Sequence, residues 1–298
     1  MSSTADIYIG TSGWSYPKGE GTWKGFFYPA GKINELEYYS QFFNTVELNS
    51  SFYRPPDPGF VYNWARRVPK GFLFAVKLWQ KFTHPKMYKE ATGEDAVIAQ
   101  SDVDLFKHSI EPLYKSGKLG AMLAQFPPSF KNDGYGQQML GALAKTFGQY
   151  PLAVELRHRS WSDDENTARL LREYHIAWVQ IDEPKFSTSV AAEVPVTADM
   201  AYFRFHGRNA RDWWTGDAET RYKYLYSPDE IAGLAERVKA SGEKVKMLFA
   251  FFNNHSQAYA PRNANDLKIA LQLPFQEIPM NLETAQDKDD TERIKGER

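Results

Sequence analysis

Charged and hydrogen-bonding side chains recur two positions apart near the ends of apolar segments in this 298-residue sequence. One residue separates Glu155 from Arg157, and one separates Arg204 from His206. Such pairs, and likewise Gln180 with Asp182, share a face of an extended strand, because successive side chains alternate between faces. We expect this polar face to point into the fold, because helices that cover the outer face need it to be apolar. Carboxylates and imidazoles can transfer protons, and guanidinium groups can bind anions through two parallel hydrogen bonds. We therefore predict an active site whose candidates for proton transfer are Glu155, His206 and Asp182.

A second set of residues, at strand ends or in the loops that follow them, could bind a substrate. Cationic groups could hold an anion, amides could form hydrogen bonds, and aromatic rings could stack on a base or sugar. Lys77 could also form a Schiff base if it were desolvated, but the sequence favours a charged anchor for an anion. The predicted substrate-binding residues are Lys77, Arg157, Arg204, Asn49, Gln125, Asn253, Asn254, Trp14, Tyr53 and Ser12.

Two other interpretations of these residues stay open. The charges could form a structural ion network, and His206 could be a hydrogen-bonded structural histidine. A metal ion could use carboxylates and histidines of this set, but the sequence has no H-x-H or H-E-x-x-H pair. Arginines also interleave with the possible metal ligands, which are His84, His206, Glu47, Glu155 and Asp182. We therefore assign no metal ligand and predict no cofactor, with a divalent metal as a disfavoured alternative.

Strand-like apolar runs alternate with helix-period segments along the whole chain. This pattern predicts an α/β fold, a single-domain (β/α)₈ TIM barrel over residues 6–275. A doubly wound sheet is less favoured, because Thr11–Tyr16 is not a glycine-rich phosphate loop. The predicted strands are Asp6–Gly10, Thr45–Asn49, Phe72–Lys77, Leu119–Phe126, Leu152–His158, Ala177–Asp182, Met200–Gly207 and Lys244–Phe252.

Some segments depart from the regular pattern. Residues 184–199 lack a helical period, which predicts a degenerate or missing helix between strands six and seven. The polar segment 279–298 is predicted to be a disordered C-terminal tail. Four residues that stand three positions before an acidic residue predict helix N-caps, namely Asn34, Ser101, Ser162 and Ser227.

Composition narrows the class of protein. The sequence has no cysteine, which excludes disulfides, thiolate metal sites and a cysteine nucleophile. The formal net charge of −1 gives no overall electrostatic case for nucleic acid, so a nucleic-acid partner is not favoured. No signal peptide or membrane-spanning run is evident, and we expect a cytoplasmic protein that does not contact membranes. The oligomeric state stays open.

Short motifs spread over nearly the whole predicted barrel resemble one family. They are Gly10–Trp14, Phe27–Pro29, Val46–Tyr53, Thr83–His84, Gln125–Phe130, Glu155–Trp161, Arg204–Gly207 and Phe251–Asn254. In this order they resemble the family called domain of unknown function 72. The resemblance implies a (β/α)₈ barrel and implies no particular reaction.

The leading functional hypothesis is an enzyme, a hydrolase or a lyase. It would act on an anionic, phosphate-bearing small molecule or nucleotide in a pocket at the C-terminal mouth of the barrel. A metal-dependent phosphodiesterase or nuclease is the second hypothesis. A non-catalytic barrel that binds a small anionic ligand is the third.

Overall fold

Parallel strands and helices alternate along the chain, as the apolar pattern predicts. The computed structural model describes residues 5–16, 19, 21–214, 216 and 218–278. The tail predicted to be disordered, residues 279–298, lies outside the described residues. The strands are β1 (Asp6–Thr11), β2 (Thr45–Leu48), β3 (Leu73–Lys77), β4 (Leu119–Gln125), β5 (Leu152–Glu155), β6 (Ala177–Trp178), β7 (Gln180–Asp182), β8 (Met200–Phe205) and β9 (Met247–Phe252).

These strands form two parallel sheets. A four-stranded sheet has the order β1-β9-β8-β7, and a five-stranded sheet has the order β2-β3-β4-β5-β6. The segment 177–182, predicted as one strand, is interrupted at Val179. Its first part pairs with β5 and its second part with β8. The prediction of eight strands therefore differs from the nine that the structure shows.

Backbone contacts connect the neighbouring edges of the two sheets. Ser12 forms a parallel bridge with Glu47, and the Gly13 N–H donates to the Glu47 carbonyl at 2.8 Å. At the other edge, the N–H of Val179 donates to the carbonyl of Val154 at 3.0 Å. The chain therefore continues hydrogen bonding across both places where the strand pairing stops.

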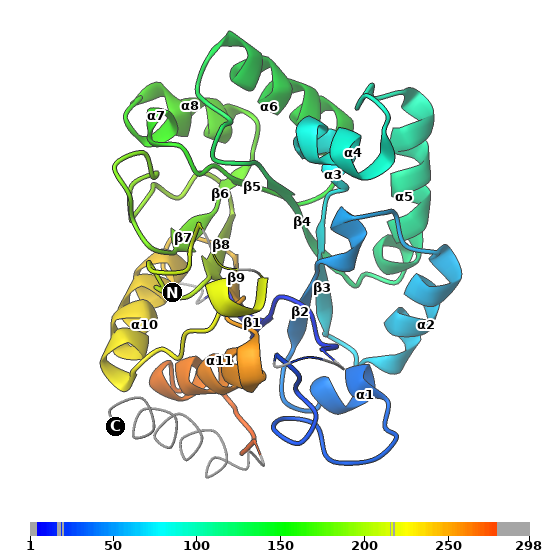
Figure 1. Cartoon of the computed structure of the whole chain (residues 1–298), viewed down its shortest axis with the longest axis vertical. Helices are drawn as coiled ribbons and strands as arrows, with labels where there is room; N and C mark the ends of the chain where they lie inside the picture. Colours follow the sequence, from blue (N-terminus) through cyan, green and yellow to red (C-terminus); the bar gives the residue numbers. More distant parts are fainter. Residues whose placement is uncertain (1–4, 17–18, 20, 215, 217, 279–298) are drawn as a thin grey trace, which may run out of the picture.

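The helices lie outside the strands, as Figure 1 shows for the longer ones. The α-helices are α1 (Glu35–Tyr39), α2 (Pro58–Arg67), α3 (Gln80–Thr83), α4 (Pro85–Thr92), α5 (Gln100–Lys115), α6 (Gly134–Phe147), α7 (Arg159–Ser162), α8 (Asn166–Glu173), α9 (Ala218–Arg221), α10 (Pro228–Gly242) and α11 (Tyr259–Ala270). Two 3₁₀ turns are η1 (Ser50–Phe52) and η2 (Ser256–Ala258). Residues 183–199, between β7 and β8, contain no helix, as their lack of period predicts. None of the helices in the described ranges is both long and apolar enough to cross a membrane.

Two of the four predicted N-caps are confirmed. Asn34 accepts from the Glu37 N–H, and Ser227 forms a reciprocal capping box with Glu230. The other two are wrong. Ser101 lies inside α5, whose first turn is instead closed by the carboxylate of Asp102 on the Ala99 N–H. Ser162 ends α7 rather than beginning α8.

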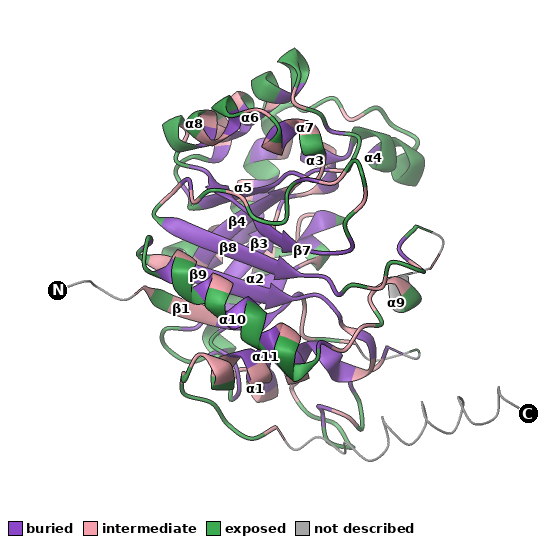
Figure 2. Cartoon of the chain, turned by 90° about the vertical axis from the view of Figure 1, so that its left-hand side faces the viewer, coloured by how far each residue is buried: buried purple, intermediate pink, exposed green. Residues whose placement is uncertain are grey.

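The strands form the core because they are apolar on both faces. All six residues of β8 are buried, and Figure 2 shows the strands as buried and the outer sides of helices such as α10 as exposed. Packing inside is close at Gly120 of β4, where a Cβ atom would lie 2.6 Å from Cζ of Phe249 and 2.9 Å from Cβ of Leu73. Glycine is therefore needed there to let the Phe249 ring fill the interior.

Two glycine-to-alanine substitutions should have opposite effects on stability. Gly120→Ala should destabilise the protein by about 1–3 kcal/mol, because the added methyl overlaps the ring and the neighbouring strand. Gly233→Ala, in helix α10 with no atom within 4 Å of the new Cβ, should stabilise it by about 0.5–1 kcal/mol through helix propensity. Urea unfolding of both variants checks this. Equal effects of the two changes would contradict the packing described at Gly120.

Candidate functional site

A cavity of about 730 Å³ opens at the carboxyl ends of the strands. We call it the mouth cavity. Parallel strands bring their carboxyl ends to one side, so side chains distant in sequence meet there. The predicted site residues that line it are Trp14, Asn49, Tyr53, Lys77, Gln125, Arg157, Arg204, His206 and Asn253.

A buried arginine with two carboxylates forms the floor of the mouth cavity. Arg204 donates from Nε and Nη2 to Oε2 and Oε1 of Glu47, at 3.0 and 2.7 Å. Its Nη1 donates to Oε2 of Glu155 at 2.6 Å. Tyr202 and Ser12 donate to the Glu47 carboxylate as well, at 2.7 and 2.9 Å. Arg204 is 2% exposed and both acids are 0% exposed, so the three side chains form an almost fully buried ion cluster.

The arginines decide the charge state of these acids. Burial alone would raise the pKa of Glu155, but Arg157 and Arg204 outweigh it and hold that pKa well below 4.5. Burial opposes Arg204 and Tyr202 at Glu47 in the same way, and the Glu47 pKa is also lowered. Both carboxylates are therefore ionised near neutral pH.

Arg157 belongs to the same cluster. Its Nε and Nη2 each lie 2.6 Å from Oε1 of Glu155, and its Nη1 lies 3.3 Å from Oε2 of Glu183. Burial raises the pKa of Glu183, against the effect of Arg157. Arg157 therefore contacts the carboxylate of Glu155, whose pKa is well below 4.5, and the carboxylate of Glu183, whose pKa is raised.

His206 is neutral and held by several partners. Burial, followed by the charge of Arg204, lowers its pKa to about 4. Nδ2 of Asn253 lies 3.0 Å from its Nδ1. An amide nitrogen can only donate, so this assignment makes Nδ1 the acceptor and puts the ring proton on Nε2. Nε2 lies 3.8 Å from Oε2 of Glu155 and 3.3 Å from Nη2 of Arg157.

The side-chain amine of Lys77, the last residue of β3, has no hydrogen bond or ion pair within the described part of the chain. Its Nζ lies 4.0 Å from the ring centroid of Phe52. Burial, followed by the charge of Arg204, lowers its pKa to about 7, although Glu155 and Glu47 act in the opposite direction. Lys77 thus presents an amine that is only partly protonated at neutral pH.

Buried polar atoms without partners surround the mouth cavity. They are Oδ1 of Asn49, Nδ1 of His255 and Nε of Arg221, each without a hydrogen bond to any described residue. An unsatisfied buried group costs about 1–3 kcal/mol, which a ligand or water could recover. The cavity therefore offers hydrogen-bonding atoms that the fold itself does not use.

Asp182 does not line the mouth cavity, which corrects its prediction as a site residue, although its carbonyl accepts from the His206 N–H at 2.8 Å. Its carboxylate accepts from Nε and Nη2 of Arg208 at 2.9 and 2.8 Å, and from the hydroxyl of Tyr226 at 2.8 Å. Arg237 also donates to it, at 3.4 Å. The prediction assigned the inner face of this strand to the wrong residues, because Glu183 rather than Asp182 approaches Arg157.

Three other predicted residues lie next to the cavity without lining it. Glu155 lies beneath Arg157 and Arg204. Ser12 is turned to Glu47. Asn254 donates to the Tyr224 carbonyl and to Oδ1 of Asn263, so its amide holds two segments of the fold together.

The sequence reasoning missed several residues that line or support the mouth cavity. Glu183 was missed because the strand was phased the other way. Arg221 and Tyr222 lie in a polar segment between β8 and α10 that has no strand pattern. Only their position in the sequence could have indicated these residues, because the loops that follow the strands line the carboxyl-terminal end of a barrel. His255 could have been found in this way, since it directly follows the Asn253–Asn254 pair.

The carboxylates weighed as metal ligands are engaged by arginines. Glu47, Glu155 and Asp182 each accept from at least one guanidinium. Within the described ranges, no three histidine or acidic side chains are grouped so that they could hold a metal ion.

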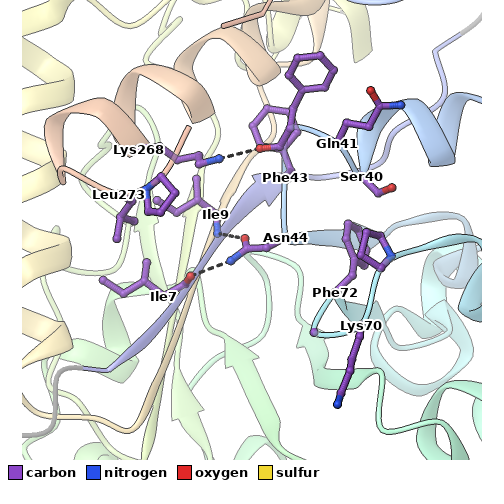
Figure 3. A pocket seen from close by; sticks show the side chains of 14 residues that line it. Ile7, Ile9, Ser40, Gln41, Phe43, Asn44, Lys70, Phe72, Lys268 and Leu273 are labelled. Carbon is purple, nitrogen blue, oxygen red and sulfur yellow. Dashed lines mark hydrogen bonds between the residues drawn. The ribbon is translucent and has the colours of Figure 1, made fainter. Parts of the chain in front are cut away.

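Two other hollows differ in character from the mouth cavity. One of about 370 Å³ adjoins it, and both are lined by His84, Met87 and Pro127. Another of about 360 Å³, shown in Figure 3, lies at the opposite ends of the strands. There the amide of Asn44 bonds to the backbone of Ile7 and Ile9. Because that amide already serves the fold, we take the mouth cavity as the candidate site.

Removing Arg204 should be far more costly than removing an exposed arginine. Arg204→Met leaves the buried carboxylate of Glu47 without a guanidinium and that of Glu155 with Arg157 alone, and it should lower the free energy of unfolding by about 3–5 kcal/mol. Adding Glu47→Gln should restore part of that loss. Arg159→Met breaks an ion pair with Asp163 whose side chains are 55% and 53% exposed, and should cost less than about 1 kcal/mol. Equal losses in urea unfolding would contradict the role of Arg204.

Stability should fall as the pH is lowered from about 6.5 to 5. Burial lowers the pKa of His206 and His255 to about 4 and, with Lys77, that of His84 to about 3. Between those values and 6.5 the unfolded chain binds protons that the folded chain does not, so acid favours unfolding. Urea unfolding at several pH values measures the slope. His84→Asn should flatten it, whereas His108→Asn, at a side chain that is 68% exposed, should leave it unchanged.

Comparison with known proteins identifies relatives along almost the whole chain. The UPF0759 protein YunF of Bacillus subtilis is 29% identical over 283 residues, which cover 90% of this chain and 96% of that protein. A DUF72 family protein of Thermotoga maritima has a crystal structure that matches 90% of this chain and 99% of its own, with 38% identity and a TM-score of 0.78. A DUF72 family protein of Enterococcus faecalis matches 91% of this chain and 98% of its own, with 28% identity and a TM-score of 0.78.

The family model described as "Protein of unknown function DUF72" matches residues 8–289. This span includes both sheets except the first two residues of β1, and it includes every residue assigned above to the mouth cavity and its floor. The resemblance inferred from short motifs is therefore confirmed, and the chain belongs to the DUF72 family.

Proposed function

We propose that the mouth cavity binds a small anionic molecule that carries a phosphate, and that the protein is an enzyme acting on it. One observation carries this proposal. Among the described residues that line the cavity, four are cationic and none is a carboxylate. The cationic residues are Lys77, Arg157, Arg204 and Arg221. Such a lining favours anions, and guanidinium groups suit phosphate and carboxylate geometry.

The ion pairs beneath the cavity show which cations remain available. Arg204 is engaged by Glu47 and Glu155, and Arg157 by Glu155 and Glu183. No ion pair engages Lys77 or Arg221 within the described residues. These two cations are therefore available to a ligand, and Arg157 is a partly available third.

The candidates for proton transfer are revised accordingly. Both oxygens of Glu155 accept hydrogen bonds from arginines, and its lowered pKa makes it a poor proton carrier. We assign it the role of positioning Arg157 and Arg204. His206 lines the cavity with a neutral imidazole and remains the proposed proton-transfer residue. Asp182 has no contact with the cavity and is left out of the proposed mechanism.

We also propose that the two sheets function as a single (β/α)₈ barrel, with β6 and β7 as one strand interrupted at Val179. The Val179–Val154 hydrogen bond and the Ser12–Glu47 bridge support continuity at the two places where the sheets meet. A cavity at the carboxyl ends of the strands then has the location that active sites take in that fold.

Inorganic phosphate should stabilise the protein against heat. Ligands that bind only the folded state stabilise it by about 2.7 kcal/mol at a hundredfold excess over Kd. The Tm should rise with phosphate concentration at constant ionic strength. Arg221→Gln should reduce the rise, because it removes a cationic group that donates to the Gly216 carbonyl at 3.3 Å but has no ion pair among the described residues. Arg211→Gln serves as the matched control, since this arginine is exposed and does not line the cavity.

Some outcomes would count against the proposal. Absence of a phosphate effect in the unmodified protein, or an equal rise with chloride, would show that the cavity is no phosphate site. Phosphate binding without conversion of any phosphorylated metabolite, followed by phosphorus NMR, would favour the non-catalytic alternative.

A further inference from the structure

Lys77 differs from Lys118 and Lys268, which are also half-buried, in that its amine has no hydrogen-bond acceptor among the described residues. Nζ of Lys118 donates to the carbonyls of Val68 and Pro69, each at 2.8 Å. Nζ of Lys268 donates to the carbonyl of Phe42 at 2.7 Å. These two amines serve the fold, whereas the amine of Lys77 faces the mouth cavity with no hydrogen bond to a described residue.

The surroundings of Lys77 favour a neutral amine. On one side lies the ring of Phe52, whose face attracts an ammonium ion but gives it no conventional hydrogen-bond acceptor. The charged groups that act on the amine come from several strands or their ends. Arg204 and Arg157 oppose its protonation, and Glu155 and Glu47 favour it. Desolvation adds to the effect of the arginines, so a substantial fraction of the amine is unprotonated near neutral pH.

The neighbouring His84 does not stabilise a protonated Lys77. His84 is neutral because burial and the charge of Lys77 lower its pKa to about 3. Its Nδ1 lies 2.9 Å from Oγ1 of Thr83. His84 therefore contributes no negative charge that would stabilise the ammonium form of Lys77.

We propose that Lys77 is a nucleophile that forms an imine with the carbonyl group of an anionic aldehyde or ketone bound in the mouth cavity. This inference rests on the proposed function, because the anionic part of the same molecule would be held by Arg221 and Arg157. It narrows the substrate class to carbonyl compounds that carry a phosphate or a carboxylate. Of the two predicted enzyme classes, it favours a lyase, since an iminium group withdraws electrons from the adjacent carbon.

The step balances without any further reactant. The neutral Nζ forms a bond to the carbonyl carbon, and the carbonyl oxygen takes up a proton to give a carbinolamine. The hydroxyl group then takes up a second proton and leaves as a water molecule, while the nitrogen lone pair forms the C=N bond. One of these protons comes from Nζ and one from solvent, so the product is an iminium ion with a single positive charge. Glu155 and Glu47 favour a positive charge at this nitrogen, whether it is an ammonium or an iminium ion.

Trapping with pyridoxal 5′-phosphate, an aldehyde that carries a phosphate, tests the proposal. The protein is treated with substoichiometric probe, reduced with borohydride and mapped by peptide mass spectrometry. We expect Lys77 to be labelled at least about tenfold faster than any other lysine at neutral pH, because its neutral fraction is larger. Inorganic phosphate should slow this labelling. The rate should level off above about pH 8, rather than rise toward the ordinary lysine pKa of 10.5.

Variants separate the nucleophile from the anion site. Lys77→Arg keeps a cation but cannot form an imine, so it should abolish the label at this position and retain the rise in Tm with phosphate. Lys118→Arg, at a lysine bonded to backbone carbonyls, should leave labelling of Lys77 unchanged. If Lys77→Arg fails to fold, the labelling site in the unmodified protein still decides the matter.

Each result has one meaning. Labelling spread over exposed lysines, with Lys77 unmodified and phosphate still stabilising, would overturn the imine and leave the anion site in place. Absence of any phosphate effect together with an unlabelled Lys77 would overturn both.

Discussion

The ion cluster of Arg204 with Glu47 and Glu155 is the interaction on which the rest of the site depends. Arg204 belongs to β8 of the four-stranded sheet, and the two acids belong to β2 and β5 of the five-stranded sheet. The cluster therefore connects the two sheets through the interior by charge as well as by packing. Burying three charges is costly, and only well-directed hydrogen bonds offset the loss of hydration. Arg204 meets this condition by donating to both acids from three nitrogens.

The same cluster sets the chemistry of the cavity above it. Its arginines keep the acids ionised and turned away from the cavity, and their charge lowers the pKa of Lys77 and His206. The floor thereby leaves the cavity lined by cationic and neutral groups only, within the described residues. One structural arrangement accounts for both the attraction of anions and the neutral amine.

Much of this arrangement could be predicted from residue spacing. The pairs Glu155–Arg157 and Arg204–His206 do share a face, because the alternation of side chains in a strand is local and strong. The alternation failed at Gln180 and Asp182 for a physical reason. The prediction assumed that the outer face of every strand is apolar because a helix covers it, but residues 183–199 form no helix. A polar loop covers this face instead, and Gln180 bonds to both the N–H and the carbonyl of Val194.

Other features depended on distant contacts and could not be read from local pattern. The interruption at Val179 depends on which sheet each half of the strand meets. The contribution of Arg221 and His255 depends on how loops fold over the strand ends. The lowered pKa of Lys77 depends on burial and on the charge of Arg204, which is distant in sequence and lies near it only in the folded chain.

The loop that replaces a helix begins with Glu183, which contributes a carboxylate to Arg157 beneath the cavity. An antiparallel bridge between His158 and Ser189 also holds it, with backbone hydrogen bonds of 2.8 Å from Arg159 to the Thr188 carbonyl and from Val190 to the Arg157 carbonyl. Side chains add further tethers, such as Arg237 to the Ala192 carbonyl. Local opening of such a segment needs less free energy than unfolding of the strands. Opening here would remove a negative charge from below the cavity and release Arg157 toward its interior. The position of this loop therefore contributes to the electrostatic potential that a ligand in the cavity meets.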